Sequence, residues 1–152
     1  MSIDPAAIRP AYWSPFVEAA KQEKLVLQVC GDCSSVKYPP SETCAECLGD
    51  KLEWQSVDGR GKVLAVTEVL ATPDDFYRGL LPLAMGSVKL LCGHVVFAFF
   101  PDAKMSGGDE VTVVAAQDVR GAPLLLAHDQ DASMTSESFD WHNSSLEKLF
   151  KV

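Results

Sequence analysis

The chain opens with residues 1–24, and the second half of this segment has a helical pattern of apolar positions. Ser14 is a favourable N-cap, Pro15 suits the first helical position, and most side chains from Phe16 to Ala20 are apolar. Aromatic side chains also gather within residues 12–16. We therefore expect a helix that packs either on the body of the same chain or on another subunit.

Short runs with alternating or continuous apolar residues follow and predict strands. Leu25–Val29 leads into a pair of cysteines, Val36–Tyr38 leads through two prolines into a second pair, and Leu52–Trp54 leaves this segment as a strand.

From residue 55 to residue 128 the pattern is of β type throughout. The first strand is long and is entered through Gly59-Arg60-Gly61, where glycines allow a sharp bend, and residues 72–82 form a loop or a short helix. Five strands are expected, at Val63–Leu70, Leu83–Leu91, His94–Phe100, Val111–Ala116 and Leu124–Ala127. Five strands with a long, bent first strand favour an OB-like Greek-key barrel, although the loop at 101–108 is too short for the helix that usually precedes the fourth strand.

The last segment, residues 129–152, begins with a polar stretch and ends with a helical signal. Ser144–Glu147 forms a capping box, and Leu146, Leu149 and Phe150 fall on one helical face. A helix this short is marginal alone, so we expect it to pack either on this chain or on another subunit.

Four of the five cysteines form two pairs, Cys30-Gly-Asp-Cys33 and Cys44-Ala-Glu-Cys47. This spacing is typical of a zinc ribbon, in which four thiolates complete a tetrahedral shell and leave no position open for a substrate. The predicted zinc is therefore structural. Mononuclear iron in a rubredoxin-like site is the alternative metal, and disulfides are disfavoured because nothing in the sequence indicates an oxidising compartment.

These patterns together predict a mainly β protein. With 152 residues, of which 47% are hydrophobic, the chain has the size and composition of one globular domain. The expected division is an N-terminal helical segment (1–24), a rubredoxin-like zinc ribbon (25–54), an OB-fold barrel (55–128) and a polar tail with a short terminal helix (129–152).

The apolar stretches are too short to cross a membrane. Leu80–Met85 is among the longest and falls far below the roughly 20 residues that a membrane helix needs. The N-terminus has an acidic residue and prolines in place of a basic start and an apolar run, so it does not resemble a signal peptide. We expect a cytoplasmic protein with no membrane partner.

The formal net charge is -8, and the acidity is spread along the chain. The densest basic group, Lys51, Arg60 and Lys62, is diluted by neighbouring acidic side chains. Nucleic-acid binding depends on clustered cations that displace counterions from phosphates, so no nucleic-acid partner is expected.

No catalytic motif is evident. Cys92 lies two residues from His94, which would place a thiol and a base on one face of a straight strand. Gly93 is expected to make a turn that breaks this relation. The other histidines, His128 and His142, are expected to be solvated.

Several short motifs match a known family: Leu25–Cys33, Tyr38-Pro-Pro, Cys44–Cys47, Leu52-Glu-Trp54 and Gly59-Arg-Gly61. Together they resemble the zinc-ribbon/OB-fold acyl-CoA-associated family, densely over residues 12–70 and more weakly over 71–128. The chain departs from the family pattern at Leu91-Cys92-Gly93, where an acidic turn with Glu-Gly is usual.

This resemblance implies a non-catalytic accessory subunit of an acyl-CoA-processing enzyme, most plainly a thiolase-type complex that forms or cleaves carbon–carbon bonds. The coenzyme A thioester would be a ligand shared with the larger subunit. A binding role needs apolar contacts and a few cations for the phosphates of coenzyme A. The candidates are Lys37, Tyr38, Arg60, Lys62 and Arg78.

Three alternatives remain open at this point. The partner could be a hot-dog-fold enoyl-CoA hydratase, the chain could be a free-standing enzyme that uses Cys92, or the barrel could bind single-stranded nucleic acid.

Overall fold

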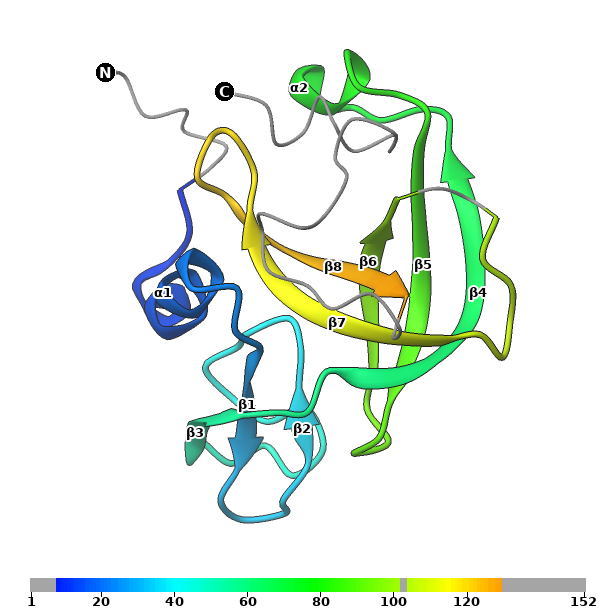
Figure 1. Cartoon of the computed structure of the whole chain (residues 1–152). Coiled ribbons are helices and arrows are strands. Elements are labelled where there is room, and N and C mark those ends of the chain that lie inside the picture. The colour runs from blue at the N-terminus through cyan, green and yellow to red at the C-terminus, as the bar shows by residue number, and fades with distance from the viewer. Residues whose placement is uncertain (1–7, 102–103, 130–152) are drawn as a thin grey trace.

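The computed structural model describes residues 8–101 and 104–129. A short helix comes first, a small three-stranded sheet follows, and a closed barrel of five strands forms the rest (Figure 1). The predicted mainly β fold, with an N-terminal helix, a ribbon and a five-stranded barrel, is confirmed. The predicted C-terminal helix lies outside the described residues.

The N-terminal helix α1 spans Ser14–Lys21 and is preceded by a 3₁₀ turn, η2, at Ala11–Trp13. The prediction that Ser14 is the N-cap is wrong. Because the 3₁₀ turn runs directly into the helix, Trp13 takes the cap position, and the Ser14 hydroxyl donates to the carbonyl oxygen of Ala11 at 2.7 Å. Phe16, Ala19 and Ala20 form the buried face, so the helix packs on its own chain.

The three-stranded sheet has the order β2-β1-β3 and is antiparallel throughout. Its strands are β1 (Val26–Cys30), β2 (Val36–Lys37) and β3 (Leu52–Ser56). Gln28 in the central strand is buried, and its side chain accepts from the Ser41 amide and donates to the Ser41 carbonyl. This amide therefore fixes the connection between β2 and the second cysteine pair.

The barrel strands have the order β4-β5-β6-β8-β7, and β7 pairs back onto β4. They are β4 (Arg60–Val69), β5 (Leu83–Leu90), β6 (Val95–Phe100), β7 (Glu110–Gln117) and β8 (Pro123–Asp129). Only β6 and β8 run parallel; the other neighbours are antiparallel. This is the order expected for a five-stranded Greek-key barrel of OB type.

Gly59 and Gly61 serve close approach of backbones, whereas the sequence suggested a sharp bend. A Cβ on Gly59 would lie 2.0 Å from the carbonyl oxygen of Val113, and one on Gly61 would lie 2.5 Å from that of Lys89. The start of β4 is thus pressed between β7 and β5, where the barrel closes.

One hydrophobic core joins the helix, the small sheet and the barrel. Phe16 and Leu27 pack in the same cluster as Val63, Val96 and Phe100. The Phe16 ring also meets an aromatic group from the N-terminal part of the chain, with ring centroids 5.9 Å from Trp13, 5.7 Å from Tyr38 and 6.4 Å from Trp54. The helix, the ribbon and the barrel therefore share buried contacts.

A second apolar cluster covers the outer side of β8. The helix α2 (Asp75–Arg78) contributes Phe76 and Tyr77, which pack near Leu124 and Leu126. β8 is buried continuously from Pro123 to His128, so His128 is buried with it, and its Nδ1 donates to the Asp129 carbonyl at 2.9 Å. The prediction that His128 is solvated is wrong for this reason.

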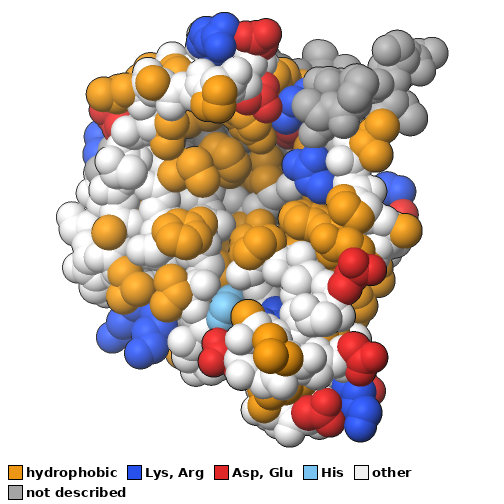
Figure 2. Space-filling view, turned by 180° about the vertical axis from the view of Figure 1, so that it is seen from behind, with side chains coloured by type: hydrophobic (Ala, Val, Ile, Leu, Met, Phe, Trp, Pro, Cys, Tyr) orange, Lys and Arg blue, Asp and Glu red, His pale blue; other side chains and the backbone are white. Residues whose placement is uncertain are grey.

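Seen from the opposite side, hydrophobic side chains gather across the middle of the molecule (Figure 2). No helix among residues 8–101 and 104–129 is long and apolar enough to cross a membrane.

Candidate functional site

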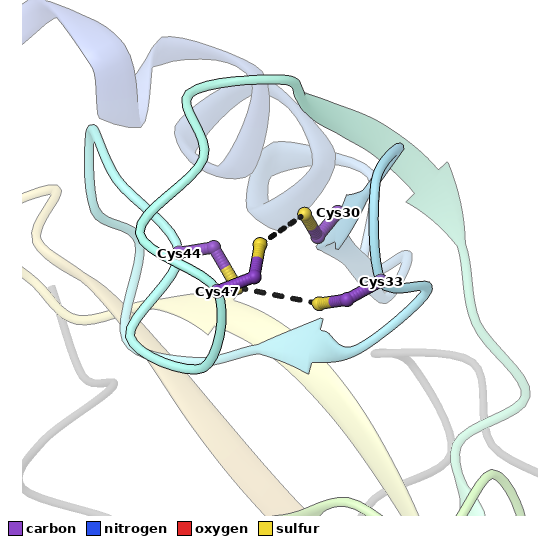
Figure 3. Close-up of side chains that lie close together, drawn as sticks. All are labelled: Cys30, Cys33, Cys44 and Cys47. Atoms are coloured by element: carbon purple, nitrogen blue, oxygen red, sulfur yellow. Dashed lines mark hydrogen bonds between the residues drawn. The ribbon is translucent and has the colours of Figure 1, made fainter.

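The structure brings together the four cysteines that the sequence singled out. Their sulfur atoms all lie within 4.8 Å of one another, and the Cys30–Cys47 and Cys33–Cys44 pairs are each 3.6 Å apart (Figure 3). Sulfurs that bind zinc tetrahedrally at about 2.3 Å stand about 3.8 Å from each other. The donor set and its spacing therefore fit a zinc ion, which would be held by Cys30, Cys33, Cys44 and Cys47 alone.

The two cysteine pairs sit on turns of the same shape. The amide of Ser34 donates to the Cys30 carbonyl, and the amide of Leu48 donates to the Cys44 carbonyl, each at 2.8 Å. Ser34 and Leu48 also share a left-handed backbone, with φ values of 61° and 62°. The Cys-x-x-Cys spacing predicts such paired turns, and each turn aims two thiols at one point.

Ser35 changes the pKa values of the two thiols that lie beside it. Its hydroxyl lies 2.8 Å from the Cys33 sulfur and 3.4 Å from the Cys44 sulfur. A hydrogen bond to this hydroxyl is the largest cause that lowers the pKa of Cys33. Together with hydrogen bonds to the backbone of Cys47 and Glu46, it lowers the pKa of Cys44 to about 6. Both shifts favour the thiolate, which is the form that binds a metal.

No hydrogen bond joins Cys92 and His94 among the described residues. Gly93 has a φ of 89°, and its amide donates to the Leu90 carbonyl at 2.8 Å, so the hairpin turns between the two side chains as predicted. Cys92 is exposed. His94 is partly buried, and burial together with the nearby charge of Lys37 lowers its pKa.

Both residues border a hollow of about 500 Å³ that also touches Lys37 and Glu46. The Nε2 of His94 is buried there without a hydrogen-bond partner among the described residues.

The predicted CoA-facing residues are not brought together as a group. Lys37 keeps 12% of its side chain exposed and pairs with Glu46 at 3.4 Å. Tyr38 packs on Phe16, and burial raises its pKa to about 12. Arg78 lies on α2, which Figure 1 shows at the end of the barrel opposite the small sheet.

Arg60 and Lys62 do share a site. They line a groove of about 630 Å³ together with Lys89, Leu64, Leu91 and Glu110. The Arg60 guanidinium is engaged by Asp58, with Nη2 to Oδ2 at 2.6 Å. Lys89 was not among the predicted residues. It joins the groove because β4 and β5 pair with Lys62 directly opposite Lys89, and that register cannot be read from the sequence alone.

The first comparison with known proteins concerns the ribbon. Residues 17–53 match the family model described as "ChsH2, rubredoxin-like zinc ribbon domain". This segment is therefore similar to the ChsH2 zinc ribbon. The resemblance to a zinc-ribbon, acyl-CoA-associated family is confirmed, and the four assembled cysteines support the predicted structural zinc.

A curated relative covers more of the chain. The "Probable enoyl-CoA hydratase alpha subunit" of Thermomonospora curvata is 35% identical over an alignment of 97 residues, and the match covers 59% of this chain and 29% of the relative. The chain thus spans less than a third of the length of that protein.

One solved structure is similar in fold, and a second gives a weaker match. The "Ltp2-ChsH2(DUF35) aldolase" structure matches 78% of this chain and 97% of its own chain, with a TM-score of 0.61 and 23% identity. A DUF35-family protein of unknown function from Sulfolobus solfataricus matches 68% of this chain and 77% of its own, with a TM-score of 0.49 and 14% identity.

Proposed function

We propose that this chain is a non-catalytic, zinc-containing accessory subunit of an acyl-CoA-processing enzyme. The ChsH2-type ribbon carries the proposal, because it is a closed four-thiolate site on a chain that also resembles a hydratase alpha subunit. Such a metal site supports a fold and offers no vacant position for catalysis. The bond-making groups then belong to the larger subunit.

The first candidate for that subunit is a thiolase-type protein that forms or cleaves carbon–carbon bonds. The second is an enoyl-CoA hydratase, which is favoured by the name of the curated relative. The two differ in the reaction of the complex: thiolysis or condensation for the first, and hydration of an enoyl-CoA for the second.

Within the complex, the groove beside β4 and β5 is the part of this chain that receives the coenzyme A end of the thioester. Lys62 and Lys89 face each other across the two strands and supply positive charge for phosphates, while Leu64 and Leu91 supply apolar contacts. Arg60 is held at the same groove by Asp58. Lys37, Tyr38 and Arg78 lie elsewhere, so their predicted contact with coenzyme A depends on how the larger subunit is placed.

Affinity purification of the full chain from its native cells, followed by mass spectrometry, tests the assignment. We expect a thiolase-type or hydratase-type protein in constant ratio to this chain, retained at high salt. Recovery of this chain without such a protein would contradict the proposal. Replacement of Lys62 and Lys89 with glutamine should weaken binding of coenzyme A to the complex, whereas replacement of the distant Lys51 should not.

The free-standing enzyme alternative has its own test. If Cys92 were a nucleophile, the purified chain alone would turn over a thioester and the Cys92→Ser variant would not. We expect no turnover by either protein.

A further inference from the structure

Several large apolar side chains are exposed around the β5–β6 hairpin and the adjoining part of β4. Leu91 and Phe97 expose 65% and 66% of their surface, Leu64 exposes 50%, and Val95 exposes 38%. We call this surface, made of Leu64, Leu91, Val95 and Phe97, the hairpin face. Exposed apolar groups scattered singly are ordinary, but a contiguous group marks a binding surface.

The strand register places these side chains on one side of the sheet. Lys62 pairs with Lys89, which pairs with Val95, so the three form one row across β4, β5 and β6. In the next row, Ser87 pairs with Phe97. Side chains in such rows lie on the same face, here the outer one, because the intervening residues of β5 and β6 are buried in the barrel.

Leu64 lies on the same face as Lys62 by regular alternation, since both are exposed and Val63 between them is buried. The pairing of β4 with β5 then shifts between Val63 and Ala65, so Leu64 is the extra residue of a β-bulge. The bulge interrupts the alternation, and Ala65 is exposed as well.

The rest of the outer surface of β6 is already covered. Phe99 stacks on Tyr77 of α2, with ring centroids 6.0 Å apart and an angle of 15° between the planes. α1 packs against β7 and β8. Within the described part of the chain, Val95 and Phe97 have no such cover, so the hairpin face is the portion of the sheet that the fold leaves open.

The charge of this surface differs from that of the whole chain. The net charge is -8, yet residues 76–101 contain no Asp or Glu. Lys62 and Lys89 border the hairpin face, and neither forms an ion pair with a described residue (salt bridges join other cations). The acidic neighbour in this row is Glu110, which lies opposite Lys62 in the β4–β7 strand register.

The charge around the hairpin face indicates which kind of protein binds there. A symmetric dimer would press the same patch against itself and bring the two lysine rows together. A different protein with an apolar centre and acidic side chains at its edge complements both the apolar and the basic groups. We infer that the hairpin face is the surface on which the larger enzyme subunit docks, an inference that rests on the proposed function.

One consequence concerns the ligand groove. Leu64, Leu91, Lys62 and Lys89 belong both to the groove and to the hairpin face or its border. A subunit docked on the hairpin face therefore forms one wall of the groove, and the coenzyme A end of a thioester is held where the two proteins meet.

Binding measurements with matched variants test the inference. The thiolase-type or hydratase-type protein identified with the full chain is produced separately, and its affinity for zinc-loaded wild-type and variant chains is measured by calorimetry. We expect Phe97→Ser to weaken binding about tenfold or more, as aromatic groups at interface centres do. Leu70→Ser removes a side chain that is 73% exposed but lies outside the hairpin face, and it should change the affinity less than about twofold. Zinc content and circular dichroism confirm that both variants fold.

A charge variant adds a second measurement. Lys89→Glu should slow association and reduce its dependence on salt. Unchanged affinity of Phe97→Ser, with a folded protein and tight wild-type binding, would overturn the docking surface and leave the proposed function intact. Absence of any wild-type complex would instead overturn the proposed function and, with it, this inference.

The same variants identify other occupants. Self-association of the wild-type chain that Phe97→Ser abolishes would assign the face to a second copy. Hydrogen-exchange protection of residues 130–152 that Phe97→Ser removes in the free protein would assign it to this chain's own tail. Either result would overturn docking of the larger subunit.

Discussion

At the scale of single residues, Asp118 has the most demanding environment in the described chain. Its side chain has no exposed surface and pairs with Arg120 at 3.0 Å. It also accepts from the backbone amides of Arg120 and Ala122 at 2.9 and 3.0 Å. The Arg120 guanidinium in turn lies 3.8 Å from the centre of the Phe76 ring. One carboxylate thus fixes the β7–β8 turn and the position of α2.

Replacing Asp118 with alanine should therefore be costly. The change removes the buried carboxylate from the Arg120 guanidinium, which keeps Asp74 at 3.8 Å, and it takes the acceptor from two backbone amides. We expect the free energy of unfolding to fall by about 3 kcal/mol. Asp75→Ala is the control, because the Asp75 side chain is 89% exposed and its ion pair should contribute less than about 1 kcal/mol. Denaturant unfolding followed by fluorescence measures both, and equal effects of the two changes would contradict the assignment.

Tyr38 gives a prediction at alkaline pH. Burial raises its pKa to about 12 in the folded protein, compared with about 10 in an unfolded chain. The neutral phenol is the form that the fold favours, so its contribution to stability is complete below about pH 10 and is lost as the pH rises to about 12. Titration of tyrosinate absorbance should lose its step near pH 12 in Tyr38→Phe. Persistence of that step in the variant would show that another tyrosine produces it.

These residues mark a limit of sequence reasoning. A connection at 117–123 between the last two strands was predicted, but the burial of Asp118 depends on α2 folding over β8, which no local pattern reveals. Tyr38 was predicted as a ligand contact because it belongs to the ribbon of the family that the sequence resembles. The packing of its ring on Phe16 requires the helix and the ribbon to meet, and the CoA contact itself stays a prediction.

At the scale of elements, Gly59, just before β4, is a position where one added methyl group should lower the stability of the fold. Gly59→Ala places a Cβ against the Val113 carbonyl, to which no flexible side chain can yield. We expect a loss of about 1 to 3 kcal/mol in the free energy of unfolding, as for other forced contacts in packed regions. Gly79→Ala, where the nearest atom lies at 3.7 Å, should be tolerated. Similar stability of the two variants in thermal unfolding would contradict the close approach.

We expect the folding of the ribbon to depend on its bound metal. Because four thiolates bind one ion and the turns that carry them have little core of their own, chelation should unfold residues 25–54 first. Cys44→Ser should abolish stoichiometric zinc binding, whereas Cys92→Ser, which changes the exposed fifth cysteine, should retain it. Metal analysis and hydrogen exchange measure both effects. A ribbon that stays protected after the metal is removed would contradict this account.

Most elements could be predicted because their signals are local. The cysteine spacing fixed the ribbon turns, and the glycine at 93 marked the hairpin turn where Cys92 and His94 separate. The helix start was misplaced by one residue because the 3₁₀ turn before Ser14 has no distinctive sequence. Strand register was beyond prediction, and with it the meeting of Lys62 with Lys89 across the groove.

At the scale of the whole molecule, the helix, the ribbon and the barrel form one body around a shared core. The sequence predicted these segments separately, and the contact of Phe16 with both the ribbon aromatics and the barrel residues could not be inferred from any one of them. A rigid body of this kind suits a protein that presents a surface to a partner. The hairpin face and the basic groove lie next to each other on it.

The most direct test of the central claim is the rate of thioester conversion by the purified larger subunit with and without this chain, alongside the rate for this chain alone. We expect no conversion by this chain alone, and a rate for the larger subunit that falls by about tenfold or more when this chain is left out. Full activity of the larger subunit by itself, or conversion by this chain unaided, would contradict the claim that it is a non-catalytic accessory subunit.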